Sequence, residues 1–190
     1  MGGNSAHTDT KLIHRVRDGD IEAFRTLVNL YKDKALSLAV SILKDETLAE
    51  DVLQEVFLKV YKKIGTFRFQ AKFSTWLYRI VVNTCYNELR KQKKNVAIAT
   101  LETDTAFQVP ESDTLLEADQ KRYIALAMKQ LTADEALLLR LFYLCEMSLK
   151  EIEEITKFKP SKIRVTLHRG RKTMQTSLDE LLGTEINSLL

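Results

Sequence analysis

Apolar residues recur at helical spacing along most of this chain. Between residues 21 and 42 they return every third or fourth position, which predicts a long amphipathic helix. A second helix is predicted over residues 47–64, where Thr47 and Glu50 form a capping-box sequence and Gly65 is a stop signal. A shorter helix is expected at about residues 11–17. The preceding residues, 1–10, are rich in Gly, Ser and Thr and are expected to be disordered.

Residues 74–94 predict a helix with two distinct faces. At about 100° per residue, a broad apolar face carries Leu77, Tyr78, Val81, Val82, Cys85 and Leu89. A separate stripe, roughly 80° wide, carries Trp76, Arg79, Asn83, Asn87, Arg90 and Lys94. A solvated surface has no need of Trp and Asn, so this stripe favours nucleic-acid binding over a plain solvent-facing role.

Aromatic residues and cations lie close together in this part of the chain. Six of the fifteen aromatic residues fall between Phe67 and Tyr86, and a basic run follows at residues 90–94. Bases stack on aromatic rings for roughly 1–3 kcal/mol each, and Lys and Arg neutralise phosphates, so the combination indicates a site for single strands. Aromatic residues at helical spacing are also typical of a core. Phe67, Phe69 and Phe73 fit a core and a base-contacting loop equally well, and Trp76 has both alternatives open.

The last third of the chain predicts a helix-turn-helix. Two capping boxes, beginning at Thr132 and Ser148, open successive apolar helices. Pro160 ends the second of these, and Ser161 is the expected N-cap of a last helix that runs past Met174. Two short helices joined by a turn of about four residues form this motif.

The last helix separates a buried side from a basic side. Its narrow apolar side carries Ile163, Leu167, Gly170 and Met174. The remaining face carries Ser161, Lys162, Arg164, Val165, His168, Arg169 and Lys172. Such a helix can lie in the major groove of duplex DNA, with Arg side chains on base edges. The alternative is a solvated basic helix in a bundle.

The distribution of charge divides the chain into three parts. The net charge of +3 comprises +6 over residues 1–95, −6 over residues 96–120 and +3 over residues 121–190. Together with the helical pattern and the scarcity of Gly and Pro, this predicts an all-α protein with two small helical domains. The expected divisions are an N-terminal domain at 11–95, a flexible acidic linker at 96–120 and a C-terminal helix-turn-helix domain at 121–182.

Sequence features of an enzyme or a metalloprotein are missing. There is no Gly-rich phosphate loop, GxSxG or HExxH, and the three His residues are scattered. Cys85 and Cys145 lie in apolar surroundings and are expected to be reduced, buried thiols of a cytoplasmic protein. No apolar run approaches a membrane span. We therefore expect no catalytic residue, metal or cofactor.

Three segments, in this order, resemble bacterial RNA polymerase sigma factors of the extracytoplasmic-function (ECF) branch of the sigma-70 family. They are AEDVLQEVFLKVYKKI, FSTWLYRIVVNTCYNELRK and SLKEIEEITKFKPSKIRVTLHRGRK. The resemblance covers about residues 12–95 and 122–178. It implies two helical domains, with a linker in place of the middle domain of larger sigma factors.

The resemblance also implies roles for individual residues. Asp51, Gln54 and Glu55 would contact the clamp helices of the largest subunit of core RNA polymerase. The −10 element, as a single strand, would be held by Asn83 and by the Phe67–Lys72 loop, with Phe67, Arg68, Phe69, Gln70 and Lys72. The stripe described above adds Trp76 and Arg79 to this expected site. The −35 duplex would be read chiefly by Arg164, Val165, His168 and Arg169. Promoter DNA and an anti-sigma factor are the other expected partners.

Three positions depart from the family pattern. Glu153 stands where the first helix of the motif usually has a small residue, Lys157 where the turn usually has Gly, and Thr166 where an Arg is usual. A Lys held in the left-handed backbone region costs on the order of 1 kcal/mol relative to Gly. These departures leave the shape of the turn and the −35 sequence open.

The sequence thus predicts a sigma factor that directs core RNA polymerase to promoters and assists their melting. The first alternative is a stand-alone helix-turn-helix regulator of duplex DNA, which would need a dimer interface that the pattern does not offer. A second alternative is a helical adaptor that binds only protein, which would not explain the stripe containing Trp76 and Asn83.

Overall fold

The structure, a computed structural model, describes residues 2–96 and 115–189. Its helices are α1 (Gly2–Arg17), α2 (Ile21–Leu43), α3 (Glu46–Lys63), α4 (Phe73–Val96), α5 (Leu115–Lys129), α6 (Ala133–Leu139), α7 (Leu149–Thr156) and α8 (Pro160–Leu189). A 3-10 turn at Ile64–Thr66 follows α3, and a π-helical turn at Arg140–Leu144 follows α6. The part of the chain that the structure describes contains no strand, which confirms the all-α prediction.

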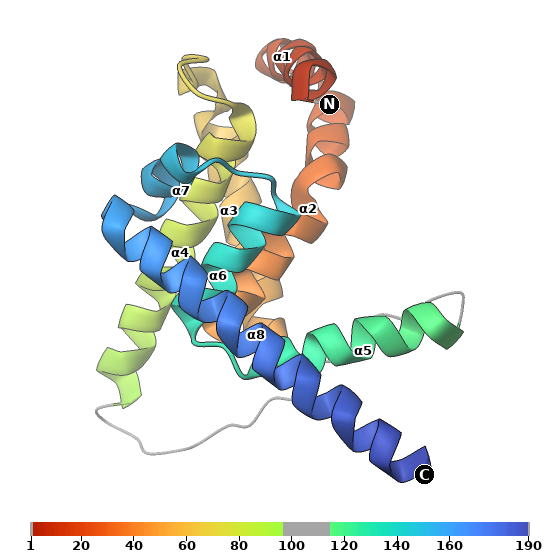
Figure 1. Ribbon diagram of the computed structural model, residues 1–190. Helices are drawn as coiled ribbons and strands as arrows, with labels where there is room; N and C mark the ends of the chain where they lie inside the picture. The colour runs from red at the N-terminus through yellow and green to blue at the C-terminus, as the bar shows by residue number, and fades with distance from the viewer. Residues whose placement is uncertain (1, 97–114, 190) are drawn as a thin grey trace.

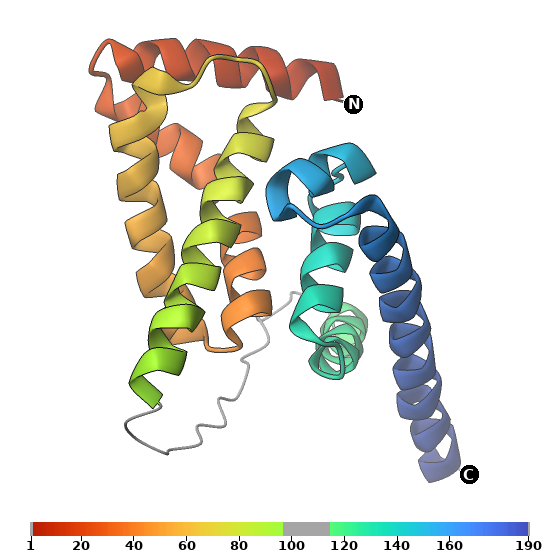
Figure 2. The same cartoon turned by 90° about the vertical axis from the view of Figure 1, so that its left-hand side faces the viewer.

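The N-terminal domain is a bundle of three helices with a fourth across one end. Helices α2, α3 and α4 pack side by side, and α1 lies over their upper end in Figure 2. The predicted apolar face of α4 is buried, including Leu77, Val81 and Cys85 at 0% exposure. This burial fixes the rotation of α4 and therefore turns its polar stripe outward.

The first helix is longer than expected. It begins at Gly2, so the prediction of disorder is wrong for Gly2 to Thr10. Asp9 explains part of the difference, because it is buried and accepts a 2.6 Å hydrogen bond from the Tyr31 hydroxyl of α2. Such a contact between two helices cannot be read from the composition of the segment.

The start of α3 also differs from the prediction. Its N-cap is Asp45, whose side chain accepts a 3.0 Å hydrogen bond from the backbone N–H of Leu48, so the predicted Thr47 cap is wrong. Lys44 has φ of 59°, and this left-handed residue ends α2 and places Asp45 in the extended conformation that a cap requires. At its other end, α3 tightens into the 3-10 turn that contains Gly65.

The C-terminal domain contains the predicted helix-turn-helix. The capping boxes at Thr132 and Ser148 are both present, and Lys157 ends α7 with φ of 61°. The last helix begins at Pro160, not after Ser161, because the carbonyl of Lys159 accepts the first helical hydrogen bond from Ile163 at 3.1 Å. Proline is favoured at the first helical position, where its missing N–H would have no helical partner.

The two domains pack against each other. Helix α7 lies on α4, and α6 lies on α2 (Figures 1 and 2). Buried apolar residues of both domains form one continuous cluster. Most of the predicted linker, residues 97–114, lies outside the described residues, whereas its end from Leu115 onward belongs to α5. No helix in the described ranges is long and apolar enough to cross a membrane.

Candidate nucleic-acid interface

Helix α8 presents the predicted reading face to solvent. Ile163 and Leu167 are buried, and Gly170 faces α6 so closely that a Cβ atom would lie 3.2 Å from Leu139 Cδ1. These contacts turn the opposite face outward. All seven predicted duplex-contacting residues are exposed, namely Ser161, Lys162, Arg164, Val165, His168, Arg169 and Lys172. The arrangement can enter a groove without a change in α8.

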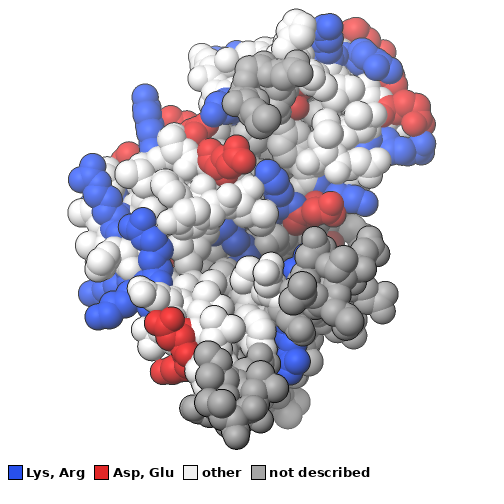
Figure 3. All heavy atoms as spheres, turned by 45° about the vertical axis from the view of Figure 1, so that its right-hand side comes forward, with Lys and Arg blue, Asp and Glu red and all other residues white. Residues whose placement is uncertain are grey.

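The cations on α8 are not equivalent. Lys162 forms a 2.7 Å ion pair with Asp134 of α6, and its ammonium lies 3.6 Å from the centre of the Phe158 ring. Among the described residues, no ion pair engages Arg164, Arg169 or Lys172. The latter three are therefore available for phosphates and bases, whereas Lys162 is held within its own domain. Figure 3 shows Lys and Arg side chains gathered along the left-hand edge of the molecule.

The predicted polar stripe is present on α4, but Trp76 is less exposed than the Asn residues of the stripe. Asn83, Asn87 and Arg90 are exposed and Arg79 is half-buried. The Trp76 ring is also half-buried, with its centre 5.3 Å from that of Phe67 and 5.7 Å from that of Phe73. One face of Trp76 therefore packs on the domain core. The side chain of Lys94 lies outside the described residues.

The loop before α4 resolves the alternatives left open for its aromatic residues. Phe67 and Phe73 are 5% and 4% exposed and meet edge to face, so both are core side chains in this structure. Phe69 is 39% exposed and has φ of 55°, a left-handed conformation that is uncommon for a large residue. The prediction that Phe67 contacts a base does not fit its burial, and Phe69 is the aromatic residue of this loop that remains accessible.

Residues of α1 position this loop, a role that the sequence pattern does not predict. The guanidinium of Arg17 donates to the carbonyls of Ile64, at 3.2 Å, and Phe67. The same guanidinium lies 5.0 Å from the centre of the Phe69 ring, which stacks on His14 at 5.3 Å. The only signal in the sequence is that Arg17 occupies the last turn of a helix, where a cation is ordinary.

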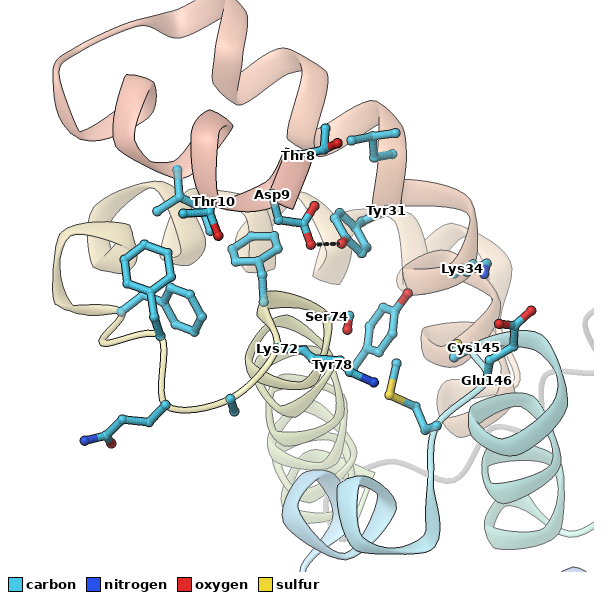
Figure 4. A pocket seen from close by; sticks show the side chains of 18 residues that line it. Thr8, Asp9, Thr10, Tyr31, Lys34, Lys72, Ser74, Tyr78, Cys145 and Glu146 are labelled. Carbon is cyan, nitrogen blue, oxygen red and sulfur yellow. Dashed lines mark hydrogen bonds between the residues drawn. The ribbon is translucent and has the colours of Figure 1, made fainter. Parts of the chain in front are cut away.

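Of the remaining loop residues, Gln70 and Lys72 line a cavity between the domains, and Arg68 lies outside its lining. Arg68, Gln70 and Lys72 are exposed. A cavity of about 860 Å³ extends from the loop to α1 and to the segment that joins the π turn to α7, as Figure 4 shows. The ammonium of Lys72 lies 3.0 Å from Glu151 Oε1 of α7. The loop thus meets the C-terminal domain directly.

The predicted polymerase-binding residues lie on the outer face of α3. Asp51, Gln54 and Glu55 are exposed. Glu55 forms a 2.6 Å ion pair with Lys59, and this hydrogen bond is the main reason why the pKa of Glu55 lies below its usual value. Leu58 and Tyr61 are also exposed on this helix, at 62% and 44%. They place exposed apolar side chains beside the acidic residues, and the sequence analysis did not identify them.

Features of a chemical active site are missing from the described residues. They contain no group of three or more His, Cys, Asp or Glu side chains that could hold a metal ion. Burial raises the pKa of the Cys85 thiol to about 12 and that of the Cys145 thiol to about 11, which suppresses the thiolate form at neutral pH.

The sequence matches two regions of sigma-70 proteins. Residues 27–95 match Sigma-70 region 2, and residues 121–174 match Sigma-70 region 4. The chain is 33% identical to the ECF RNA polymerase sigma factor SigW of Bacillus subtilis, over 90% of this chain and 97% of that protein. It is 32% identical to the RNA polymerase sigma-H factor of Pseudomonas aeruginosa, over 92% and 95% of the two chains.

Solved structures of sigma factors share the fold. The sigma factor RpoE in complex with the anti-sigma factor NepR from Bartonella quintana superposes with a TM-score of 0.69 at 22% identity, covering 82% of this chain and 96% of that one. CnrH in complex with the cytosolic domain of CnrY superposes with a TM-score of 0.62 at 20% identity, covering 91% and 98%. With its two matched regions and with relatives matched over almost their whole length, this chain belongs to the ECF branch of the sigma-70 family, whose members are transcription-initiation factors and not enzymes.

Proposed function

We propose that this chain recruits core RNA polymerase to specific promoters and helps to open them. The observation that carries the proposal is the presence of two differently built exposed surfaces in one sigma factor. The basic face of α8 suits a duplex, and the α4 stripe with its preceding loop suits a single strand. Together they provide recognition of two promoter elements by one protein.

Each surface takes one role in this proposal. The Arg and Lys side chains of α8 read and hold the −35 duplex. Asn83, Arg79 and the accessible loop side chains of Arg68, Phe69 and Gln70 hold unpaired bases of the −10 element. Phe67 and Phe73 support the loop from below. The burial of these two rings and the exposure of Phe69 support this division of labour.

Polymerase binding is assigned to the outer face of α3. Asp51, Gln54 and Glu55 contact the clamp helices of the largest subunit, and Leu58 and Tyr61 add apolar area beside them. An acidic surface with adjacent exposed apolar side chains is suited to a protein partner, not to DNA. Because polymerase is its partner, the protein acts in the bacterial cytoplasm. The relatives solved with NepR and CnrY support an anti-sigma factor as a further partner.

The experiment that tests the proposal measures binding to core polymerase. Reversal of charge in the double variant Asp51→Lys, Glu55→Lys should weaken the complex at least tenfold in a titration, because charge repulsion replaces attraction at the contact. Binding of the same variant to a −35 duplex should not change. Asp33→Lys, a reversal at an exposed acid on α2, is the matched control and should bind core polymerase as the unaltered protein does.

Two results would contradict the proposal. One is an unchanged affinity of the double variant for core polymerase. The other is nanomolar binding of the free protein to one duplex site in physiological salt, which would support a stand-alone helix-turn-helix regulator. Non-specific contacts alone should be weak and should decrease steeply as salt rises.

A further inference from the structure

Glu151 connects the helix-turn-helix to the single-strand loop. Its Oε2 accepts hydrogen bonds from the backbone N–H and the hydroxyl of Ser148, at 2.9 and 2.7 Å, and so caps α7. Its Oε1 lies 3.0 Å from the ammonium of Lys72 and 3.4 Å from the hydroxyl of Thr75. One oxygen therefore serves its own helix, while the other binds the domain that carries the loop.

Glu151 is well placed to hold a charge. Its side chain is only 16% exposed, whereas that of Lys72 is 59% exposed. Burial acts to raise the pKa of Glu151, but hydrogen bonds from Ser148 and Lys72 outweigh it and hold that pKa below the usual value. At neutral pH the side chain is consequently a carboxylate. It engages the ammonium of Lys72 with an anionic oxygen at 3.0 Å.

Other polar contacts join the domains along α4 and α2. The hydroxyl of Tyr86 donates to Asp134 at 2.9 Å. Lys44 of the N-terminal domain likewise donates to the backbone carbonyl of Leu131 at 3.3 Å, whereas Arg140 of the C-terminal domain donates in the opposite direction, to the Ser37 hydroxyl at 2.8 Å. Glu151 is the one among the C-terminal partners named here that touches a residue predicted to hold the single strand.

The docked helix α7 lies beside the single-strand stripe of α4. Residues that meet the C-terminal domain, such as Thr75 and Tyr86, and the stripe that contains Arg79 and Asn83 have centres roughly 70° apart around the helix. A strand that follows the stripe into the loop would therefore pass close to α7. That helix carries the carboxylate of Glu151, which repels phosphates.

A turn of the C-terminal domain lines the cavity next to the loop. Phe69, Gln70 and Lys72 line one part of this cavity, and the turn of residues 145–147 lines another. Figure 4 shows Lys72 and Tyr78 of the N-terminal domain with Cys145 and Glu146 around the same space. Glu146 has φ of 54°, so the turn contains a left-handed residue. Access to the inner side of the loop is thus limited by the other domain.

We propose that the C-terminal domain closes the single-strand site of the free protein, and that the carboxylate of Glu151 holds it closed by taking the place of a phosphate on Lys72. This inference rests on the single-strand role assigned above to the loop and α4. The reading face of α8 stays exposed in the same arrangement, so only one of the two DNA surfaces is closed. A strand binds after the domains separate, and its apparent affinity falls with the fraction of molecules that are open.

A matched pair of substitutions tests the role of Glu151. Glu151→Gln keeps a side chain that can complete the capping box, since Gln serves in that motif as well as Glu. The substitution removes the negative charge that pairs with Lys72. Glu153→Gln removes one charge from the exposed side of the same helix. Loss of a half-buried ion pair should raise the affinity for a labelled random-sequence single-stranded DNA 12-mer roughly threefold to tenfold, and Glu153→Gln should change it less than twofold.

The native thiols report separation of the domains in the same samples. Cys145 lies in the interface beside Tyr78, whereas Cys85 lies in the core of the N-terminal domain. Opening exposes Cys145 and leaves Cys85 protected. Glu151→Gln should therefore accelerate modification of Cys145 by a thiol reagent by the same factor that it raises strand affinity, as measured by peptide mass spectrometry. Tyr86→Phe removes the hydrogen bond to Asp134 from the N-terminal side of the interface. It should also accelerate modification of Cys145 and raise strand affinity.

The outcomes are distinct. Faster modification of Cys145 and tighter strand binding in Glu151→Gln, with neither in Glu153→Gln, support the inference. Faster modification without tighter binding overturns it, because the domains would then separate without uncovering the site. An unchanged Cys145 rate also overturns it. If Cys145 is modified faster but no variant binds the strand, the single-strand role of the loop is wrong as well. Binding to core polymerase tests the rest of the proposed function separately.

Discussion

At the scale of single residues, Lys157 is the clearest point of strain in the DNA-binding domain. It ends α7 with φ of 61°, and its N–H donates to the carbonyl of Glu153 at 2.9 Å. Glycine adopts this conformation without a clash between Cβ and the backbone, so a Lys here costs on the order of 1 kcal/mol. The departure noted in the sequence therefore changes the energy of the turn and leaves its shape intact.

We expect Lys157→Gly to stabilise the protein by about 1 kcal/mol, because Gly adopts the left-handed conformation without the Cβ clash. In a chain of this length that corresponds to a rise in the melting temperature of about 2–4 °C. Lys157→Ala keeps the Cβ atom and should leave the melting temperature nearly unchanged. Equal effects of Gly and Ala, measured by thermal unfolding, would show that the left-handed backbone is not the source of the strain.

Also at this scale, Arg164 and Lys172 should differ in what they contribute to duplex binding. Arg164 is exposed near the start of α8, where base edges are within reach, and bidentate Arg–guanine contacts provide roughly 1–3 kcal/mol of discrimination. Arg164→Ala should relax the preference at one or two base pairs in a selection from randomised −35 sites. Lys172→Ala should weaken binding uniformly across the same sites, because a phosphate contact carries no sequence information. An unchanged site preference in Arg164→Ala would exclude it as a reader.

At the scale of elements, periodicity predicted the helices and local chemistry predicted only some of their ends. The capping boxes at Thr132 and Ser148 formed as expected because each satisfies its own backbone. The Thr47 box failed because Asp45 caps the helix earlier, after a left-handed Lys44 that no local rule indicated. The sequence predicts a helix break at Pro160, whereas this residue is the first of α8.

The loop before α4 was beyond sequence reasoning for a different reason. It has no period, so nothing in the pattern distinguishes Phe67, which is buried, from Phe69, which is not. Contacts from α1, more than 45 residues away in the chain, decide which ring turns inward: Arg17 fixes the backbone and His14 stacks on Phe69. Long-range contacts of this kind determine which aromatic ring of the loop is accessible, a choice that the sequence pattern leaves open.

Because only some loop residues are exposed, a test of strand opening should change Asn83 and the exposed loop side chains. Asn83→Ala, and the triple substitution of Arg68, Phe69 and Gln70 by Ala, should leave the affinity of the closed promoter complex nearly intact and slow melting, since a few kcal/mol per extruded base must be replaced by contacts to the protein. Permanganate reactivity of unpaired thymines measures the rate. A pre-melted template should rescue part of the defect, and wild-type opening rates in both variants would contradict the assignment.

Phe67 provides a control for this test. Its ring is buried against Phe73, Phe69 and Trp76, so Phe67→Ala should lower the stability of the free protein by about 3–5 kcal/mol. A melting defect in that variant would reflect damage to the domain. For this reason the exposed loop residues, and not Phe67, carry the test.

At the scale of the whole molecule, the docking of the two domains was not predictable from the sequence. The pattern indicated two tethered domains, each with its own apolar side. The structure joins these sides into one cluster and adds polar contacts between distant positions, such as Arg140 with Ser37 and Tyr86 with Asp134. None of these side chains forms a recognisable local motif, so pairing them requires knowledge of the fold.

The docked arrangement cannot serve both promoter elements at once. Positions −35 and −10 lie about 25 base pairs apart, which corresponds to roughly 80 Å at 3.4 Å per base pair. A globular chain of this length has a radius of gyration of about 16 Å, so two docked domains cannot reach that far.

Binding of polymerase and promoter together should therefore drive the domains apart. Fluorophores attached at Lys32→Cys on α2 and Gln175→Cys on α8, both exposed positions, should move apart by tens of Å when core polymerase and promoter DNA are added. The native Cys85 and Cys145 are buried and should label slowly. A pair at Lys11→Cys and Lys32→Cys, both within the N-terminal domain, should keep its separation. A constant distance between α2 and α8 in the promoter complex would mean that the two elements are not bound by one copy of this chain.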